Sequence, residues 1–180
     1  LLISLPFAAY FSYVPVFLQS SNVANPAFKM TFGQMSEIVF LLLLPWFFAR
    51  FGLKWVLLTG MLAWVFRYAL FALAAPDSIG WMIMVGILLH GCCYDFVYVA
   101  GQIYIDKKAT PEIRAQAQGL FVLVSYGVGQ GLGTLAAGWI FNSIMSHGTT
   151  LHQWQNFWFI PLLFSAVVTV LFVFGFREKT

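Results

Sequence analysis

The chain has 180 residues, of which 61% are hydrophobic and only 8% are charged, and its mean hydropathy is +0.86. A soluble domain carries about 25% charged residues, so this composition excludes one and indicates a membrane protein. The net charge of +3 does not indicate a nucleic-acid partner, because the basic residues are spread over several short segments and form no patch.

Six apolar stretches have a length of about 20 residues, which is what a helix needs to cross a bilayer. In chain order they are 2–20, 33–51, 54–75, 79–105, 114–143 and 155–176. We therefore expect an all-α membrane protein, a bundle of six transmembrane helices surrounded by lipid. The chain starts at Leu1 inside an apolar stretch, without a charged signal region. This start predicts that residues 1–180 are a fragment of a longer chain.

The basic residues favour one side of the predicted spans. On the opposite side Lys29 is accompanied only by acidic or histidine side chains, such as Asp77, His147 and His152. The positive-inside rule assigns the basic side to the cytoplasm, which predicts that both ends of the fragment lie in the cytoplasm. The residues of the basic side are Arg50, Lys54, Lys107, Lys108, Arg114, Arg177 and Lys179.

Three ionisable side chains lie well inside these apolar stretches: Glu37, Arg67 and Asp95. Each is 12 or 13 residues from a basic residue at the end of its span, which corresponds to a depth of roughly 18–20 Å at the helical rise. Charges at this depth are costly and mark a polar pathway or a buried ion pair. We expect Arg67 to pair with Asp95; pairing with Glu37 or with backbone carbonyls are the alternatives.

Several polar and aromatic residues are candidates for binding a solute. Gln34 and Glu37 are three residues apart and share a helix face, and a carboxylate at this depth suits a group that takes up and releases a proton. His90 and Tyr94 share another face and are expected to line a cavity, whereas Asp95 turns toward a neighbouring helix. With Tyr10 and Tyr13 from the first span, they suit a planar, polar, uncharged solute, of which a nucleobase is one example.

Other kinds of chemistry find no support in the sequence. There is no phosphate-binding glycine loop, no zinc-protease motif and no nucleophile elbow. Cys92 and Cys93 are adjacent within an apolar span, so they are read as packing residues, and His147 and His152 have no companions at metal-ligand spacing. The protein is therefore expected not to be an enzyme and to bind no metal and no cofactor.

Two stretches carry a family resemblance. The segment PWFFARFGLK, from Pro45 to Lys54, resembles the loop signature of the major facilitator superfamily, with Arg50, Gly52 and Lys54 at its gating positions. In it, Pro45 replaces the leading glycine and Ala49 replaces the aspartate. The segment LHGCCYDFVYVAGQIYIDKKATPEIRAQAQGL (89–120), together with GQMSE (33–37), is similar to the C-terminal half of the nucleoside:proton symporter family.

The resemblance implies one half of a twelve-helix carrier whose N-terminal half is missing from this chain. It implies proton-driven nucleoside import by alternating access. Gln34 and Glu37 match substrate-contacting positions of the family, His90 and Tyr94 match positions that line the nucleoside site, and Asp95 matches an essential carboxylate. In the first span, Tyr10 and Tyr13 occupy the region of the family's Gln/Asn pair.

Two alternative functions remain open at this point. One is transport of another small polar solute within the same superfamily. The other is a stand-alone six-helix substrate-binding subunit of an energy-coupling transporter, which has about this length.

Overall fold

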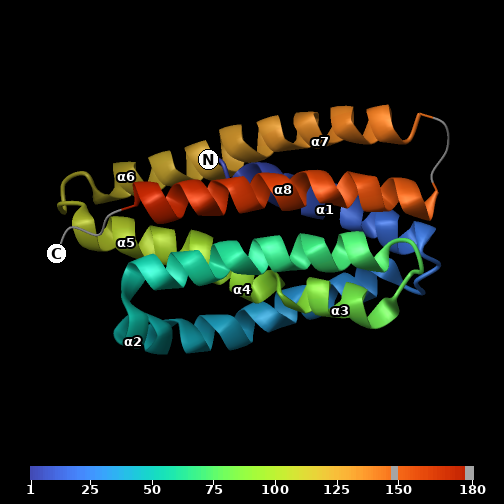
Figure 1. Cartoon of the computed structure of the whole chain (residues 1–180). Coiled ribbons are helices and arrows are strands. Elements are labelled where there is room, and N and C mark those ends of the chain that lie inside the picture. Colours follow the sequence, from blue (N-terminus) through green and yellow to red (C-terminus); the bar gives the residue numbers. More distant parts are fainter. Residues whose placement is uncertain (147–149, 177–180) are drawn as a thin grey trace.

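The computed structural model describes residues 1–146 and 150–176, and these form a bundle of helical rods that run along one long axis (Figure 1). The predicted all-α six-helix bundle is confirmed. The rods are α1 (Ser4–Ser20), two limbs of α2 (Pro26–Ala74), a rod made of α3 (Gly80–Leu88), α4 (His90–Tyr94), η1 (Asp95–Val99) and α5 (Ala100–Lys108), a rod made of α6 (Arg114–Val122), η2 (Leu123–Gly129) and α7 (Gln130–Ile144), and α8 (Leu151–Gly175).

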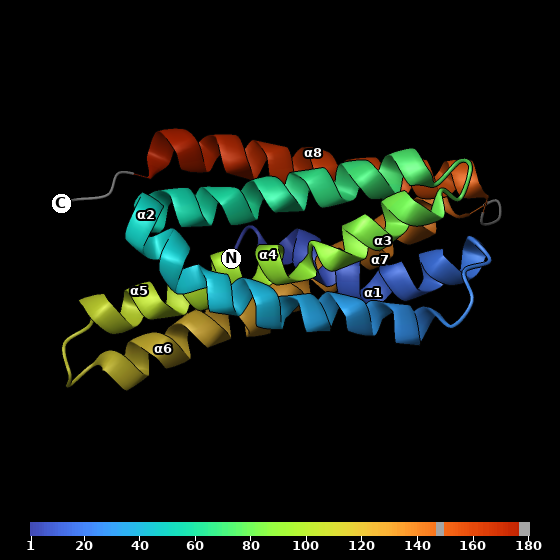
Figure 2. The ribbon, with the colours of Figure 1, turned by 90° about the horizontal axis from the view of Figure 1, so that it is seen from below.

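Helix α2 folds back on itself at Gly52. The backbone of Gly52 has φ 76° and ψ 173°, a region that is essentially restricted to glycine because it has no Cβ. The chain therefore reverses within one residue, and α2 becomes a first limb (26–51) and a second limb (53–74). Figure 2 shows the bend and the two limbs on either side of it.

The helix bounds differ most from the predicted spans at two ends. The first limb of α2 begins at Pro26 instead of residue 33, because a proline fits the first helical turn, where no backbone N–H is needed. Helix α8 begins at Leu151 instead of residue 155, because Thr150 and Gln153 form a capping box. The stretches 26–74, 80–108, 114–144 and 151–175 are long and apolar enough to cross a membrane.

Two rods contain a π-helical segment. In the 80–108 rod this segment is η1, directly after Tyr94, and in the 114–144 rod it is η2, which contains Tyr126. π-Helical turns are rare and occur frequently at functional sites. Both rods therefore change their helical geometry in the middle of the bundle, and this region is a candidate for a functional site.

The core is mainly aromatic. Tyr68 on the second limb of α2 stacks on Trp158 of α8, with ring centroids 5.8 Å apart, and its hydroxyl donates a hydrogen bond to the Pro6 carbonyl of α1. In contrast, α6 has no buried residue and α7 buries only Gly133 and Ala137. The 114–144 rod therefore lies at an edge of the bundle.

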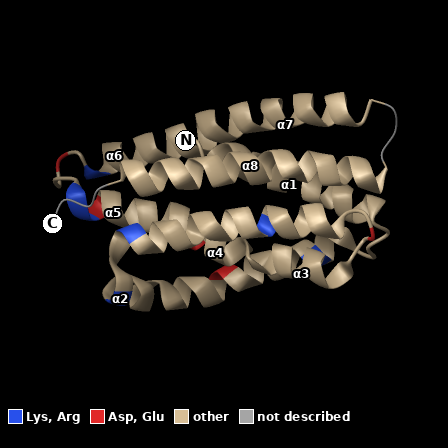
Figure 3. Cartoon of the chain, in the orientation of Figure 1, with Lys and Arg blue, Asp and Glu red and all other residues tan. Residues whose placement is uncertain are grey.

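Most of the lysine and arginine residues lie at the end of the bundle that holds the bend of α2 and the α5–α6 connection (Figure 3). At that end Arg114 Nε lies 3.5 Å from Asp106 Oδ1 and links α6 to α5. Of the residues used to predict orientation, Arg177, Lys179 and His147 lie outside the described part of the chain.

Candidate functional site

The site is built where the first limb of α2 crosses α4. A Cβ on Gly91 would lie 2.6 Å from the Ser36 carbonyl oxygen, so only glycine lets the two helices approach this closely. The Ser36 hydroxyl accepts a 3.0 Å hydrogen bond from the Gly91 N–H and donates one of 2.5 Å to the Gly33 carbonyl. This crossing fixes the positions of the neighbouring side chains, Glu37 and His90.

Glu37 and His90 are in direct polar contact. His90 Nε2 lies 3.0 Å from Glu37 Oε1; the His90 side chain is 3% exposed and that of Glu37 is 30% exposed. Because a carboxylate only accepts hydrogen bonds, the imidazole donates from Nε2. The sequence placed both residues at the site, but it did not predict their direct contact.

Aromatic rings surround His90. Its ring is nearly parallel to that of Tyr10, at 14° and with centroids 4.9 Å apart, and Phe11 meets it edge-on at 5.4 Å. Phe7 and Tyr94 lie at 6.2 and 6.1 Å. The imidazole is therefore held in one orientation, with Nε2 directed at Glu37.

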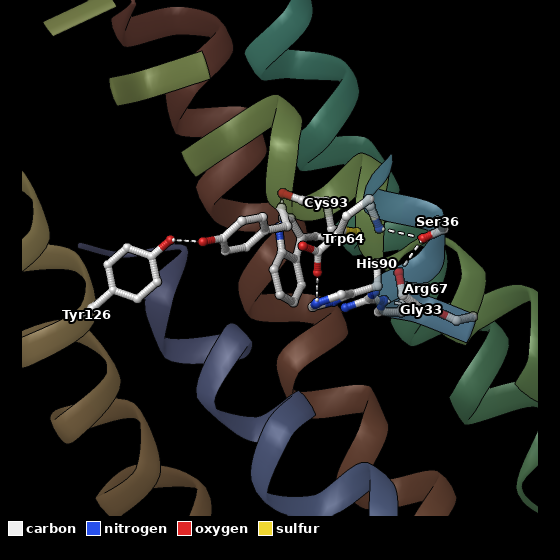
Figure 4. Close-up of polar contacts among 11 residues, drawn as sticks. Gly33, Ser36, Trp64, Arg67, His90, Cys93 and Tyr126 are labelled. Atoms are coloured by element: carbon white, nitrogen blue, oxygen red, sulfur yellow. Dashed lines mark hydrogen bonds and ion pairs between the residues drawn. The ribbon is translucent and has the colours of Figure 1, made fainter. Parts of the chain in front are cut away.

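An open cleft of about 380 Å³ lies against this pair. Tyr94 is on its wall as predicted, and on the opposite rod the Tyr126 hydroxyl donates a 2.9 Å hydrogen bond to the Tyr94 hydroxyl. Figure 4 shows that the Tyr126 side chain points from η2 toward the residues of the other rods. The residues that line the cleft are Phe7, Phe11, Glu37, His90, Tyr94, Tyr126 and Gln130.

Four of these lining residues were not predicted as site residues. Tyr126 and Gln130 are four residues apart, so they share one helix face, and they lie within the glycine-rich stretch of the fifth span. A polar pair inside an apolar span was the signal that could have found them. Phe7 and Phe11 carry no such signal, because phenylalanine is common throughout this chain.

Arg67 does not form either of the ion pairs considered for it. It is fully buried, its Nε donates a 3.0 Å hydrogen bond to the Gly86 carbonyl, and its guanidinium lies 4.0 Å from the centroid of the Tyr10 ring and 5.0 Å from that of Trp64. Within residues 1–146 and 150–176 no salt bridge joins it to Asp95 or to Glu37. Bonding to a backbone carbonyl, the third alternative, is what the structure has.

The register between two neighbouring rods explains why Arg67 misses Asp95. The Trp64 indole N–H donates a 3.2 Å hydrogen bond to the Cys93 carbonyl, so these two residues lie side by side on antiparallel rods (Figure 4). Arg67 follows Trp64 and Asp95 follows Cys93, and the two rods run in opposite directions. The two side chains therefore start from positions that are roughly 7 Å apart along the axis. Counting residues from Lys54 and Lys107 had placed them at one depth.

Asp95 is buried, with 2% of its surface exposed, and it begins the π-helical segment η1. In the described part of the chain, its Oδ2 atom has no hydrogen-bond partner. As predicted from the helical angle, it does not line the cleft with His90 and Tyr94. Its role in proton coupling stays a prediction.

Three other predicted contact residues lie off the cleft. Tyr10 is buried behind two lining residues of the cleft: it stacks on His90 and meets Phe11 edge-on. Tyr13 stacks on Phe141 of α7 at 4.6 Å, because it lies on a different face of α1. Gln34 is exposed one helical turn before Glu37 and is not among the lining residues of this cleft.

The predicted gating residues surround the bend of α2. Gly52 forms the bend itself, Arg50 is exposed just before it, and Lys54 is partly exposed just after it. In the segments that the structure describes, neither Arg50 nor Lys54 belongs to a salt bridge. A gating role for this loop stays a prediction.

A family of transporters matches this chain along its whole length. A family model described as "Nucleoside H+ symporter" matches residues 1–180. The chain is 34% identical over 166 residues to the nucleoside permease NupG of Escherichia coli, and the match covers 92% of this chain and 39% of that protein. It is 32% identical over 173 residues to the xanthosine permease of Escherichia coli, covering 96% and 41%.

Solved structures agree with the sequence matches. A crystal structure of the nucleoside transporter NupG superposes with a TM-score of 0.83 at 29% identity, covering 98% of this chain and 47% of that one. The chain therefore spans less than half the length of the relatives that it matches.

Proposed function

Because this chain belongs to the nucleoside H+ symporter family, we propose that the protein containing it imports nucleosides together with protons. The observation that carries the proposal is the cleft in which the Glu37–His90 pair lies among aromatic rings. A nucleoside has a flat base that stacks on aromatic side chains and hydroxyl groups that donate hydrogen bonds to a carboxylate. We propose Glu37, His90 and Tyr94 as the main contacts, joined by Tyr126 and Gln130.

The rest of the carrier is part of the same proposal. The chain spans about two fifths of its curated relatives, so a second six-helix unit would supply the facing wall of the cleft. Rocking of the two units around a site at mid-membrane would then give alternating access. Gln34 is exposed beside Glu37 and would contact the substrate or the second unit once this wall is present.

The membrane and the orientation are also proposed. The basic end of the bundle carries Arg50, Lys54, Lys107, Lys108 and Arg114, and by the positive-inside rule this end faces the cytoplasm. Six crossings then put both ends of the chain on the cytoplasmic side of a bacterial inner membrane. Cysteine labelling at single introduced sites on the two sides of the bundle would check this orientation.

The function is tested by uptake into proteoliposomes that contain the full-length protein. Labelled uridine and adenosine should accumulate when the outside is acidic, and a protonophore should abolish the accumulation. Glu37→Gln should reduce uptake by about 10- to 100-fold, because hydrogen bonds to a charged group are among the stronger ones. Failure to take up any nucleoside, together with uptake of another small polar solute, would instead support the broader transporter function.

A further inference from the structure

The apolar parts of the spans hold more acidic than basic residues. In the apolar parts of the spans, away from their ends, the acidic residues are Glu37 and Asp95 and the basic residue is Arg67. With a neutral imidazole at His90 and both carboxyl groups ionised, these groups sum to one negative charge. One added proton makes the middle of the bundle neutral, which lowers the cost of moving the site through the membrane.

His90 is placed to share this proton with Glu37. The 3.0 Å contact joins the two side chains, and among the described residues the His90 Nδ1 atom has no hydrogen-bond partner, so it has a lone pair for a proton. Two groups in such close contact take up protons as a pair and not as separate residues. The pair carries one negative charge before it takes up the proton and none afterwards.

The surroundings of His90 determine how the proton is held. The titratable groups in contact with it are Glu37 of α2, Tyr10 of α1 and Tyr94 of α4. Tyr126 of η2 is bonded to Tyr94, and Asp95 of η1 lies away from the cleft. The Arg67 guanidinium lies over the Tyr10 ring on which His90 also stacks. A fixed positive charge this close disfavours an imidazolium that stands alone. Positive charge on His90 therefore depends on the Glu37 carboxylate.

We propose that Glu37 and His90 act as one proton-binding unit and that His90 makes nucleoside uptake respond to pH near neutrality. This inference rests on the proposed function. The coupling has a physical cause: when the cleft closes over an uncharged nucleoside, Glu37 loses its water, and an unprotonated pair would then keep an unbalanced charge away from water. The closed, loaded site therefore binds the proton more tightly than the open, empty one, so proton and nucleoside favour each other's binding.

Removal of His90 leaves a carboxyl group without its imidazole partner. An isolated carboxyl group titrates roughly two pH units below an isolated imidazole. The pH at which uptake is half-maximal should therefore move toward acid by about one unit or more in His90→Gln, whose amide still donates a hydrogen bond to Glu37 but does not take up a proton. In the wild type, KM for uridine should change by up to about tenfold per pH unit across the transition.

The experiment measures uridine KM and uridine-driven proton uptake between pH 5 and 8.5 in proteoliposomes with the full-length protein. His152→Gln is the matched control, because it makes the same substitution at an exposed residue at one end of α8, and it should keep the wild-type profile. His90→Tyr is the second variant if His90→Gln folds poorly, since a phenol keeps the ring beside Tyr10 and the donor to Glu37. Both His90 variants also alter a proposed uridine contact, so the inference is judged by the pH of half-maximal uptake and not by the affinity at pH 5.

The outcomes separate the inference from the proposed function. A His90 variant whose half-maximal pH coincides with that of the wild type overturns the inference and leaves the function intact. The inference is also overturned if Asp95→Asn removes the pH response while His90→Gln keeps it, because Asp95 alone would then carry the proton. If the wild type itself shows no uptake driven by a proton gradient, the proposed function fails.

Discussion

The Tyr126 hydroxyl donates a 2.9 Å hydrogen bond to the Tyr94 hydroxyl, and this contact joins the 80–108 rod to the 114–144 rod. Tyr94 lies directly before η1, and Tyr126 lies within η2. The bond therefore links the two rods at the start of η1 and within η2. The two phenols also form one wall of the cleft.

Removal of this bond should weaken substrate binding more than it weakens the fold. In Tyr126→Phe we expect KM for uridine to rise about three- to tenfold, which corresponds to the free energy of one hydrogen bond. Tyr104→Phe is the control, because it removes a phenol hydroxyl from the exposed part of α5. Uptake kinetics and thermal unfolding of both variants check this. Equal KM values in Tyr126→Phe and wild type would contradict a role of the bond at the site.

The crossing at Gly91 should not tolerate a larger residue. In Gly91→Ala the new methyl group would collide with the Ser36 carbonyl at 2.6 Å, so the helices must move apart. The free energy of unfolding should fall by about 1–3 kcal/mol, as for other overpacked sites, and the Glu37–His90 contact should loosen. Gly131→Ala is the control, since a Cβ there meets no atom within 4 Å. Thermal unfolding in detergent measures the difference, and equal unfolding temperatures would refute the close crossing.

A charge exchange between Arg67 and Asp95 should fail to restore function. The two side chains do not pair in the described structure, and Arg67 is held by the Gly86 carbonyl and the Tyr10 ring. Arg67→Asp places a carboxylate beside that carbonyl, where it has no donor. The double variant Arg67→Asp/Asp95→Arg should therefore yield no more folded protein or uptake than the worse single variant. Recovery in the double variant would show that the two residues pair in another state of the transporter.

The bend of α2 should depend on Gly52. Alanine at φ 76° and ψ 173° is strained, at a cost of about 1–3 kcal/mol. Gly52→Ala should lower the unfolding temperature, whereas Gly119→Ala on the exposed helix α6 should not, because a Cβ there meets no atom within 4 Å. An unchanged unfolding temperature in Gly52→Ala would mean that the bend adopts another conformation.

The sequence alone determined the class of the protein and pointed to three of the residues that line the cleft, Glu37, His90 and Tyr94. Sixty-one per cent hydrophobic residues require a membrane environment. Helical periodicity separated His90 and Tyr94 from Asp95, and the structure places the first two on the cleft and the third away from it. Such features are local, because they depend only on spacing along one helix.

Only the tertiary structure decided which side chains meet. Glu37 contacts His90 and not Arg67, and Arg67 bonds to Gly86, because the Gly91 crossing and the Trp64–Cys93 contact set the register between rods. Tyr126 and Gln130 join the site from a rod far away in sequence. Contacts of this kind depend on how helices pack side by side, and the periodicity of a single helix contains no information about its neighbour's register.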